Sequence, residues 1–234
     1  MSAAERFAAF PDMPIERNLR LDTLPPAQRQ LWDDLGNVPL DVVLYGGTAL
    51  ALRLGHRQSA AFDFFSSEPF SPGQLLAAVA FLGRVEVVDS RENALTLLTP
   101  GGVKVSFSGG MNLQLVAEQS IAADNGLVIA SIDDLAGTNS KALLDRSEWR
   151  DYVDVDALLG AGCELPDIIG CATTIFEPSF VFPGALFLCC LISFGDGTAP
   201  DVPADVLARL EAAVATAWRA EVPVVTAFAS RISP

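Results

Sequence analysis

The chain has few basic side chains, one histidine and four cysteines among its 234 residues. Lysine and arginine total 15, against 29 aspartates and glutamates, so the formal net charge at neutral pH is −14. The basic residues form no cluster of the kind that binds phosphate backbones. This charge disfavours a dedicated nucleic-acid-binding protein. Contact with RNA would need a local patch, and a basic protein partner is an equally natural match.

The cysteine and histidine pattern disfavours a zinc site, a disulfide framework and histidine catalysis. Cys163, Cys171, Cys189 and Cys190 lie in the last third of the chain, in apolar surroundings, with no CxxC pair. This spacing is typical of buried free thiols. The single histidine, His56, directly precedes Arg57, and we expect a structural or phosphate-facing role for it rather than that of a general base.

Long apolar runs are also missing. The longest extends from Phe180 to Phe194, and Pro183 and Gly184 interrupt it. It is shorter than the roughly 20 residues that a membrane-spanning helix needs. The first residues of the chain lack the basic-then-apolar pattern of a signal peptide. We therefore expect no membrane association and a cytoplasmic location.

Local patterns predict an α+β protein: a small mixed sheet with flanking helices, followed by a C-terminal helical bundle. We expect one domain over residues 1–128 and a helical domain over residues 129–234. Strands are predicted at residues 41–45, 62–65, 84–88, 94–98 and 103–107, with further edge strands at 112–116 and 127–130. Helices are predicted at residues 26–32, 48–54, 71–82, 133–144, 148–159, 166–174, 183–194 and 203–218, after an irregular lead-in that ends at Pro25.

The most informative stretch is the turn at Gly46, Gly47 and Thr48, which separates a short strand from a helix. Glycines let the backbone approach an anion, and the amides at the start of a helix point toward it. Asp63 lies on the next short strand, and a carboxylate beside a phosphate cradle can hold Mg²⁺. Alone, a glycine pair is typical of a turn that needs a positive φ, and a single acid is typical of a solvent-facing strand position. Together they indicate a nucleotide site.

Two blocks of sequence resemble a known family. The string GGTALALRLGHRQS, followed after two residues by FDFFS, resembles the first motif of the AbiEii/AbiGii toxin family of nucleotidyltransferases, which belongs to the DNA polymerase β-like superfamily. Residues 134–146 and 150–154 resemble the family's helical motif, and the resemblance covers about residues 30–215. It implies a nucleotidyltransferase-type sheet and the toxin of a prokaryotic toxin–antitoxin pair. Such a toxin has a cognate antitoxin partner and transfers NMP from an Mg–NTP to an acceptor such as tRNA.

The resemblance also implies roles for particular residues. The catalytic positions are Asp63, Arg146 and Asp154, with Asp63 as a ligand of the Mg²⁺ ion. The positions that contact the nucleotide and its phosphates are Gly46, Gly47, Thr48, Arg57, Ser59 and Asn139. On the residues alone, Arg146, Arg150 and Asp151 are equally typical of a charged set on a helix surface.

The chain departs from the family pattern at two of these positions. The first acid of the family's D-x-D pair falls on Ala61, and the family's lysine falls on Asn139. Lys141 is two positions further along, about 200° around a helix axis, so it cannot replace that lysine. The strand expected at residues 103–107 offers only Lys104 and Ser106 where a third acid would lie. Two interpretations follow: a transferase with impaired activity, or a degenerate fold that acts as a nucleotide- or antitoxin-binding module.

Overall fold

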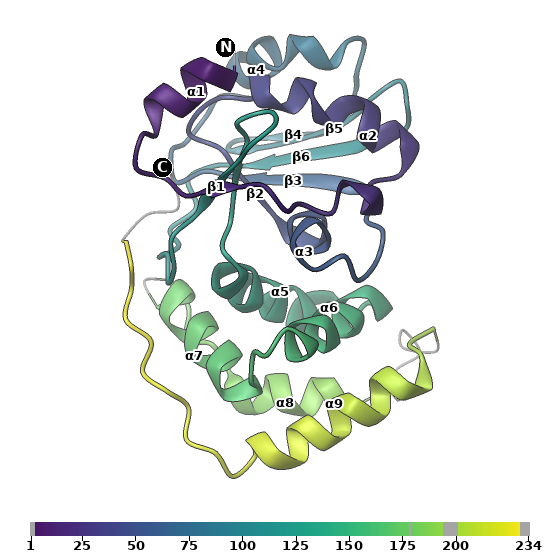
Figure 1. Cartoon of the computed structure of the whole chain (residues 1–234), viewed down its shortest axis with the longest axis vertical. Helices are drawn as coiled ribbons and strands as arrows, with labels where there is room; N and C mark the ends of the chain where they lie inside the picture. Colours follow the sequence, from purple (N-terminus) through teal and green to yellow (C-terminus); the bar gives the residue numbers. More distant parts are fainter. Residues whose placement is uncertain (1–2, 178, 194–200, 230–234) are drawn as a thin grey trace. The chain divides into compact units, whose positions relative to one another are not determined.

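Figure 1 shows a computed structural model of the chain, which describes residues 3–177, 179–193 and 201–229. Its contacts divide these residues into two compact units. The sheet unit contains residues 3–112 and 118–131, and the helical unit contains residues 113–117 together with the described part of 132–229. The expected domain limits, 1–128 and 129–234, remain a prediction about which parts fold independently.

The sheet unit is built on a mixed sheet of eight strands in the order β1-β7-β8-β2-β3-β6-β5-β4. Parallel pairs join β1 to β7, β8 to β2 and β3 to β6, and the other neighbours are antiparallel. The strands are β1 (Ile15–Glu16), β2 (Val43–Tyr45), β3 (Ala61–Phe65), β4 (Glu86–Arg91), β5 (Ala94–Leu98), β6 (Lys104–Ser108), β7 (Ser120–Ala122) and β8 (Val128–Ile129). The expected small mixed sheet is confirmed.

Four α-helices and three short 3-10 helices accompany this sheet. The α-helices are α1 (Ala3–Ala9), α2 (Pro26–Trp32), α3 (Gly46–Leu54) and α4 (Pro72–Ala78), and the 3-10 helices are η1 (Leu21–Thr23), η2 (Asp34–Asn37) and η3 (Ala80–Leu82). Helices α1, α2 and α4 lie on one side of the sheet and α3 lies on the other (Figure 1). Proline opens both α2 and α4, where its missing N–H costs no hydrogen bond.

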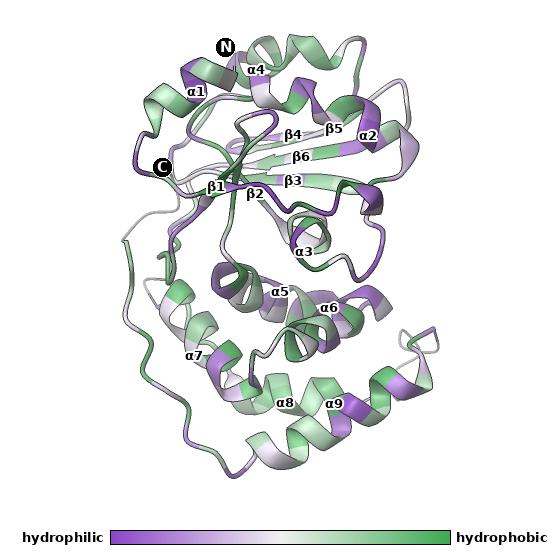
Figure 2. Ribbon diagram, in the orientation of Figure 1, coloured by the Kyte–Doolittle hydropathy of each residue, from purple (hydrophilic) through white to green (hydrophobic). Residues whose placement is uncertain are grey.

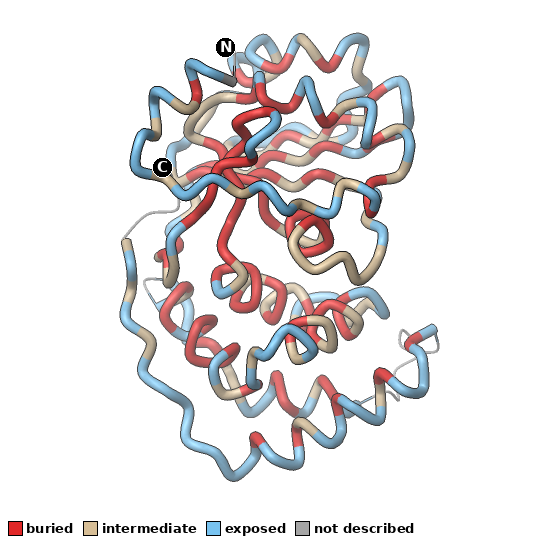
Figure 3. Tube along the Cα trace, viewed as in Figure 1, coloured by how far each residue is buried: buried red, intermediate tan, exposed pale blue. Residues whose placement is uncertain are grey.

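The central strands have one fully buried face and one half-exposed face. Phe62 and Phe64 on β3 and Phe107 on β6 are almost completely buried, and the rings of Phe64 and Phe107 stack with centroids 5.1 Å apart. The residues between them along each strand are only partly buried. Figure 3 shows this alternation along the strands. Because side chains alternate across a sheet, the polar residues of β3 and β6 share the half-exposed face.

The helical unit consists of five α-helices within the described residues. They are α5 (Ile132–Arg146), α6 (Trp149–Gly160), α7 (Leu165–Phe176), α8 (Gly184–Ile192) and α9 (Ala204–Ala217). Helices α5 and α7 pack closely at Gly137, where an added Cβ would lie 2.5 Å from Cδ1 of Ile175 and 3.0 Å from the backbone nitrogen of Ala172. Figure 2 shows that α8 is hydrophobic along most of its length. The expected C-terminal helical bundle is confirmed.

Within residues 3–177, 179–193 and 201–229, no single helix combines the length and the apolarity that a membrane crossing requires. Helices α6 and α7 reach that length and apolarity only when taken together, and they are bent by 114° relative to each other.

Three expectations about the elements were wrong, and long-range contacts explain the first. The lead-in before Pro25 contains α1 and β1, and the Arg6 side chain holds α1 by donating to the carbonyl oxygens of Gly126, Gly36 and Val38 at 2.6, 3.2 and 2.6 Å. Residues 112–116 form no strand; they contribute one isolated bridge, between Leu115 and Ala229. The helix expected at 71–82 is divided into α4 and η3. The helix expected at residues 183–194 would end at Phe194, which lies outside the described residues.

Candidate active site

The glycine turn brings the backbone directly against a carboxylate. Gly46 follows β2 and opens α3. Its φ is +68°, a backbone conformation that residues with a Cβ rarely adopt. A Cβ added to Gly46 would lie 3.1 Å from Oδ2 of Asp63 and 3.4 Å from its Cβ. Gly47 is not among the glycines with positive φ. The strand order therefore places the start of α3 beside Asp63, as the order of motifs in the sequence predicts, and the phosphate contacts of both glycines remain a prediction.

Thr48 links α3 to the strand that carries Asp63. Its side chain is completely buried, and its hydroxyl donates a hydrogen bond to the carbonyl oxygen of Ala61. A hydroxyl has one proton to donate. In this structure the Thr48 side chain therefore positions β3, and only its backbone amide is left for the expected phosphate contact.

The other end of α3 is fixed by a residue to which the sequence patterns assigned no role. The Arg53 guanidinium donates to the carbonyl oxygens of Ala130 and Ile129 at 2.7 and 3.2 Å, and to the Ser120 hydroxyl at 2.9 Å. It also lies 3.5 Å from a carboxylate oxygen of Glu16, and its side chain is 10% exposed. Arg53 thus ties α3 to β7, β8 and β1. The sequence does carry a signal for this role, because Arg53 is the one charged residue in an otherwise apolar helix.

The register of β3 and β6 determines which side chains surround Asp63. Ala61 pairs with Lys104 and Asp63 pairs with Ser106. The two pairs lie on the half-exposed face, since Phe62 and Val105 between them are fully buried. Strand neighbours lie about 5 Å apart, so side chains on one face touch. On the β6 side, the neighbourhood of this carboxylate therefore holds a methyl group, an ammonium and a hydroxyl, and on the β2 side Asp63 pairs with Tyr45.

These residues do not fit the two-carboxylate magnesium site that the resemblance implies. Mg²⁺ prefers oxygen ligands and is held by one or two carboxylates together with substrate phosphates. Asp63 is the one acid on β3 and β6, and the Lys104 ammonium beside Ala61 repels a cation. Among the described residues, no group of three or more His, Cys, Asp or Glu side chains could hold a metal ion. Asp63 as a metal ligand remains a prediction.

The loop between α3 and β3 carries two of the predicted phosphate contacts. The helix ends at Gly55, which has a φ of +71°. Arg57 is half-buried, and one of its terminal nitrogens donates to the carbonyl oxygen of Gln58 at 3.0 Å, so part of the guanidinium is used within the loop. Ser59 is also half-buried and lies just before β3. Their approach to a phosphate stays a prediction.

In the helical unit, Arg146 supports a helix terminus. Its guanidinium contacts the Asp151 carboxylate at 2.7 to 3.2 Å. Asp151 is 2% exposed and also accepts the backbone N–H of Glu148 at 3.0 Å, which completes a capping box at the start of α6. Arg146 itself is 52% exposed. The sequence left two interpretations of Arg146 and Asp151, as ligand-binding residues or as a charged set on the helices. The contacts in the structure are those of the second interpretation.

The other predicted residues of the helical motif are buried, and the nearby Lys141 contacts residues outside that motif's predicted site. Asn139 on α5 is 6% exposed, and its Nδ2 has no hydrogen-bond partner within the described part of the chain. Asp154 on α6 is also buried. Lys141 pairs with Asp145 and lies 5.2 Å from the centre of the Phe180 ring. Lys141 therefore does not occupy the place of the lysine that Asn139 replaces.

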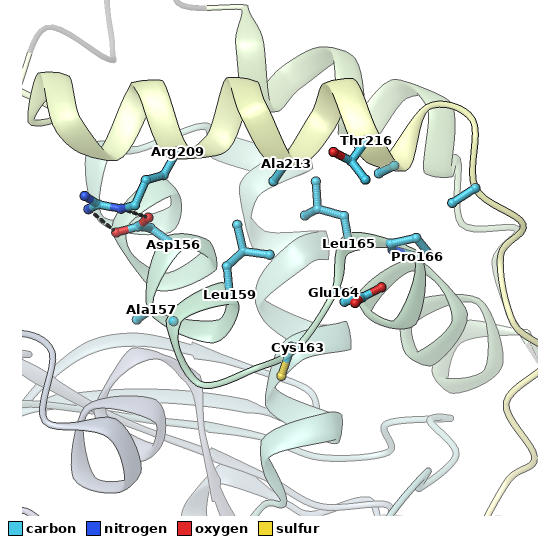
Figure 4. Close-up of a pocket in the computed structure, with 13 residues that line it drawn as sticks. Asp156, Ala157, Leu159, Cys163, Glu164, Leu165, Pro166, Arg209, Ala213 and Thr216 are labelled. Atoms are coloured by element: carbon cyan, nitrogen blue, oxygen red, sulfur yellow. Dashed lines mark hydrogen bonds and ion pairs between the residues drawn. The ribbon is translucent and has the colours of Figure 1, made fainter.

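A separate cavity of about 560 Å³ lies between α6, α7 and α9 (Figure 4). Its walls are mostly apolar and include Leu159 and Leu165. At one end Arg209 pairs with Asp156 through two contacts of 2.7 Å, and a third contact of 2.9 Å joins it to Asp205. Because two carboxylates already balance this cation, the cavity offers no phosphate-binding charge.

Comparison with known proteins agrees with this fold and with both motifs. Residues 30–223 match the family model described as nucleotidyl transferase AbiEii toxin, type IV TA system. An uncharacterized protein of Aquifex aeolicus is 32% identical over 117 residues, which are 49% of this chain and 56% of that protein. The nucleotidyltransferase toxin MenT4 of Mycobacterium tuberculosis has the same fold, with a TM-score of 0.58 and 14% identity over 82% of this chain and 83% of MenT4.

Proposed function

Because the chain belongs to the AbiEii family of nucleotidyltransferase toxins, we propose that it binds a nucleoside triphosphate at the Gly46 turn and transfers its nucleotide only at a low rate. Proteins of this family generally use an NTP and a divalent metal. The observation that carries the proposal is the approach of the Gly46 backbone to Asp63. That approach requires a glycine, because a Cβ at residue 46 would lie 3.1 Å from Oδ2 of Asp63.

Binding of the triphosphate is supported by groups that do not depend on the two altered positions. The backbone amides at the N-terminus of a helix, together with the positive end of the helix dipole, attract phosphate, and α3 begins at Gly46. Gly46 keeps that terminus free of side-chain bulk. Arg57 and Ser59 lie in the loop that leads from the same helix back to β3, and we assign them to the phosphates.

A low transfer rate follows from Ala61 and Asn139. Single electrostatic contacts at a transition state are typically worth about 3–4 kcal/mol. Loss of a carboxylate and a lysine that act on the same phosphates therefore lowers the rate by roughly 10⁴, allowing for non-additivity. Asp63 remains as the catalytic acid in this proposal.

The second candidate is a degenerate fold that serves as a nucleotide- or antitoxin-binding module. The observation that favours it is the β3–β6 register, which gives Asp63 no acidic neighbour on these strands. The net charge of −14 suits a basic antitoxin, and it disfavours extended contact with an RNA such as the tRNA acceptor of the first candidate. Both candidates place the protein in a prokaryotic cytoplasm, as part of a toxin–antitoxin pair.

The decisive experiment measures incorporation of labelled NTP into total tRNA by the unmodified protein and its variants. We expect slight incorporation by the unmodified chain, a large increase in the Ala61→Asp/Asn139→Lys variant, and much smaller increases in the single variants, because the two groups act as a unit. Asp63→Asn is the control that removes the remaining acid. If the double variant folds, binds nucleotide and stays inert, the binding module is the better account. If the unmodified chain is already as fast as the double variant, the proposed impairment is wrong.

A further inference from the structure

Lys104 brings a positive charge to the face of the sheet that carries Asp63. It pairs with Ala61 across β3 and β6, on the face that carries Asp63. Its side chain is exposed, and within the described residues it forms no hydrogen bond or ion pair. Lys104 and Asp63 are diagonal neighbours across the two strands, and a lysine side chain is long enough for its ammonium to reach a phosphate placed beside Asp63.

Compared with a site that has acids at residues 61 and 63 and a neutral residue at 104, this chain carries two more positive units of formal charge, which equals the charge of a divalent metal ion. Two carboxylates at residues 61 and 63 beside a neutral neighbour would carry −2, which repels a free triphosphate until a metal neutralises it. Alanine at residue 61 removes one negative charge, and Lys104 adds one positive charge. The pair of strands is therefore formally neutral at this point without any metal.

We propose that the Lys104 ammonium takes the place of the metal ion, so that the site binds the free triphosphate in preference to its magnesium complex. This inference rests on the proposed nucleotide binding at the Gly46 turn and names the chemical form of the ligand. Lys104 is then a phosphate-binding residue. An ammonium donates hydrogen bonds to phosphate oxygens, as a metal accepts their lone pairs, and it needs no second acid to hold it.

The same geometry constrains any attempt to restore the lost acid. A carboxylate introduced by Ala61→Asp would lie next to Lys104 and form an ion pair with it. This ion pair competes with a metal ion for the new carboxylate, so removing Lys104 as well should strengthen a magnesium site. Ala61→Asp/Lys104→Ser should therefore bind ATP with a stronger dependence on Mg²⁺ than Ala61→Asp alone.

The test is calorimetric titration of the full chain with ATP, once in EDTA and once with excess MgCl₂. We expect the unmodified protein to bind ATP at least as tightly in EDTA as with Mg²⁺. Lys104→Ala should weaken binding in EDTA about tenfold, the value of one charge-assisted contact, and abolish the preference for the free form. Arg91→Ala is the matched control, because Arg91 is an exposed cation of the same sheet that is paired with Asp89, and it should change neither titration.

The outcomes separate this inference from the proposed function. ATP binding that requires Mg²⁺ in the unmodified chain would leave the nucleotide site standing and refute the role of Lys104. Equal losses for Lys104→Ala in both buffers, or none in either, would also refute it. A folded protein that binds ATP in neither buffer would contradict the nucleotide site, and this inference with it. Thermal unfolding of each variant shows whether the fold is intact, which we expect because Lys104 is exposed.

Discussion

The glycine turn of the sheet unit and the α5–α6 junction of the helical unit both carry residues that the sequence resemblance predicts to contact the triphosphate, yet their contacts in the structure differ. At the turn, a backbone conformation brings Gly46 against Asp63. At the junction, Arg146 and Asp151 are joined to each other and to the start of α6. The first region keeps a surface that a ligand could contact, and the second uses its charges to hold two helices.

The difference separates contacts made by the backbone from contacts made by side chains. Amides at a helix N-terminus stay in place whatever residue stands at position 61 or 139, because the helix itself fixes them. Charged side chains can be replaced without moving the helix that carries them. At the junction, Arg146 and Asp151 take part in an ion pair and a helix cap that need no nucleotide.

The largest expected effect comes from removing the residue that positions α3. Arg53→Met should lower the free energy of unfolding by about 3 kcal/mol, because three buried acceptors lose a charged donor. Urea denaturation measures the change. Arg29→Met is the control, since the exposed Arg29–Asp33 pair contributes about 0.5 kcal/mol or less. Equal stabilities for the two variants would show that α3 does not depend on Arg53.

The glycine turn can be tested with a pair of substitutions that share backbone strain. Gly46→Ala and Gly102→Ala both put a side chain at positive φ, which costs about 1–2 kcal/mol. An added Cβ at Gly102 meets nothing within 4 Å, whereas at Gly46 it meets Asp63. Calorimetry should therefore show about a tenfold loss of ATP affinity for Gly46→Ala alone. The same loss in both variants would mean that strain, and not contact with Asp63, controls binding.

The structural role of the junction predicts a smaller effect, on stability alone. Asp151→Ala should destabilise the protein by about 1–2 kcal/mol through loss of the cap and of the Arg146 contact. Asp145→Ala, at an exposed residue paired with Lys141, should cost about 0.5 kcal/mol or less. Thermal unfolding gives both values. A stable Asp151→Ala variant that has lost ATP binding would instead assign the pair to the ligand.

The thiols give the mildest test and report on the helical unit, since it holds all four described cysteines. Burial, together with the charges of Asp133, Asp134 and Asp167, raises the pKa of Cys171 to about 12. At pH 8 the Cys171 thiol is therefore protonated and should not react with a thiol reagent, whereas the exposed Cys189 should react readily. Mass spectrometry of the labelled peptides checks this. Rapid labelling of Cys171 in the native protein would show that α7 opens.

The pKa of Cys171 also sets the direction of a pH effect on stability. Its folded value lies above the ordinary value of 9.0, so the stabilisation is fully present below pH 9 and is lost as the pH rises toward 12. A Cys171→Ala variant should therefore lose less stability than the unmodified chain over that range, as denaturation at pH 8 and pH 11 would measure.

Some features follow from the sequence alone because their causes are local. Alternation of apolar residues at 62–65 and 103–107, proline at the start of α2, and glycine at the turn after β2 each act within a few residues, so the elements and the approach of the turn to Asp63 could be predicted. Family membership likewise depends on strings of neighbouring residues. The absence of the second acid and of the lysine, at Ala61 and Asn139, is also visible without coordinates.

Other features depend on which distant segments meet. Strand β1 exists because Ile15 pairs with Ile121, and the isolated bridge of residues 112–116 joins Leu115 to the distant Ala229. Lys104 lies beside Ala61 only through the register of two strands about 40 residues apart, and one residue of slip would turn Lys104 to the other face. Pairing partners and register are set by how the whole core packs. For that reason the residues of the candidate site could be named from the sequence, whereas the cation beside the missing acid was decided by the tertiary structure.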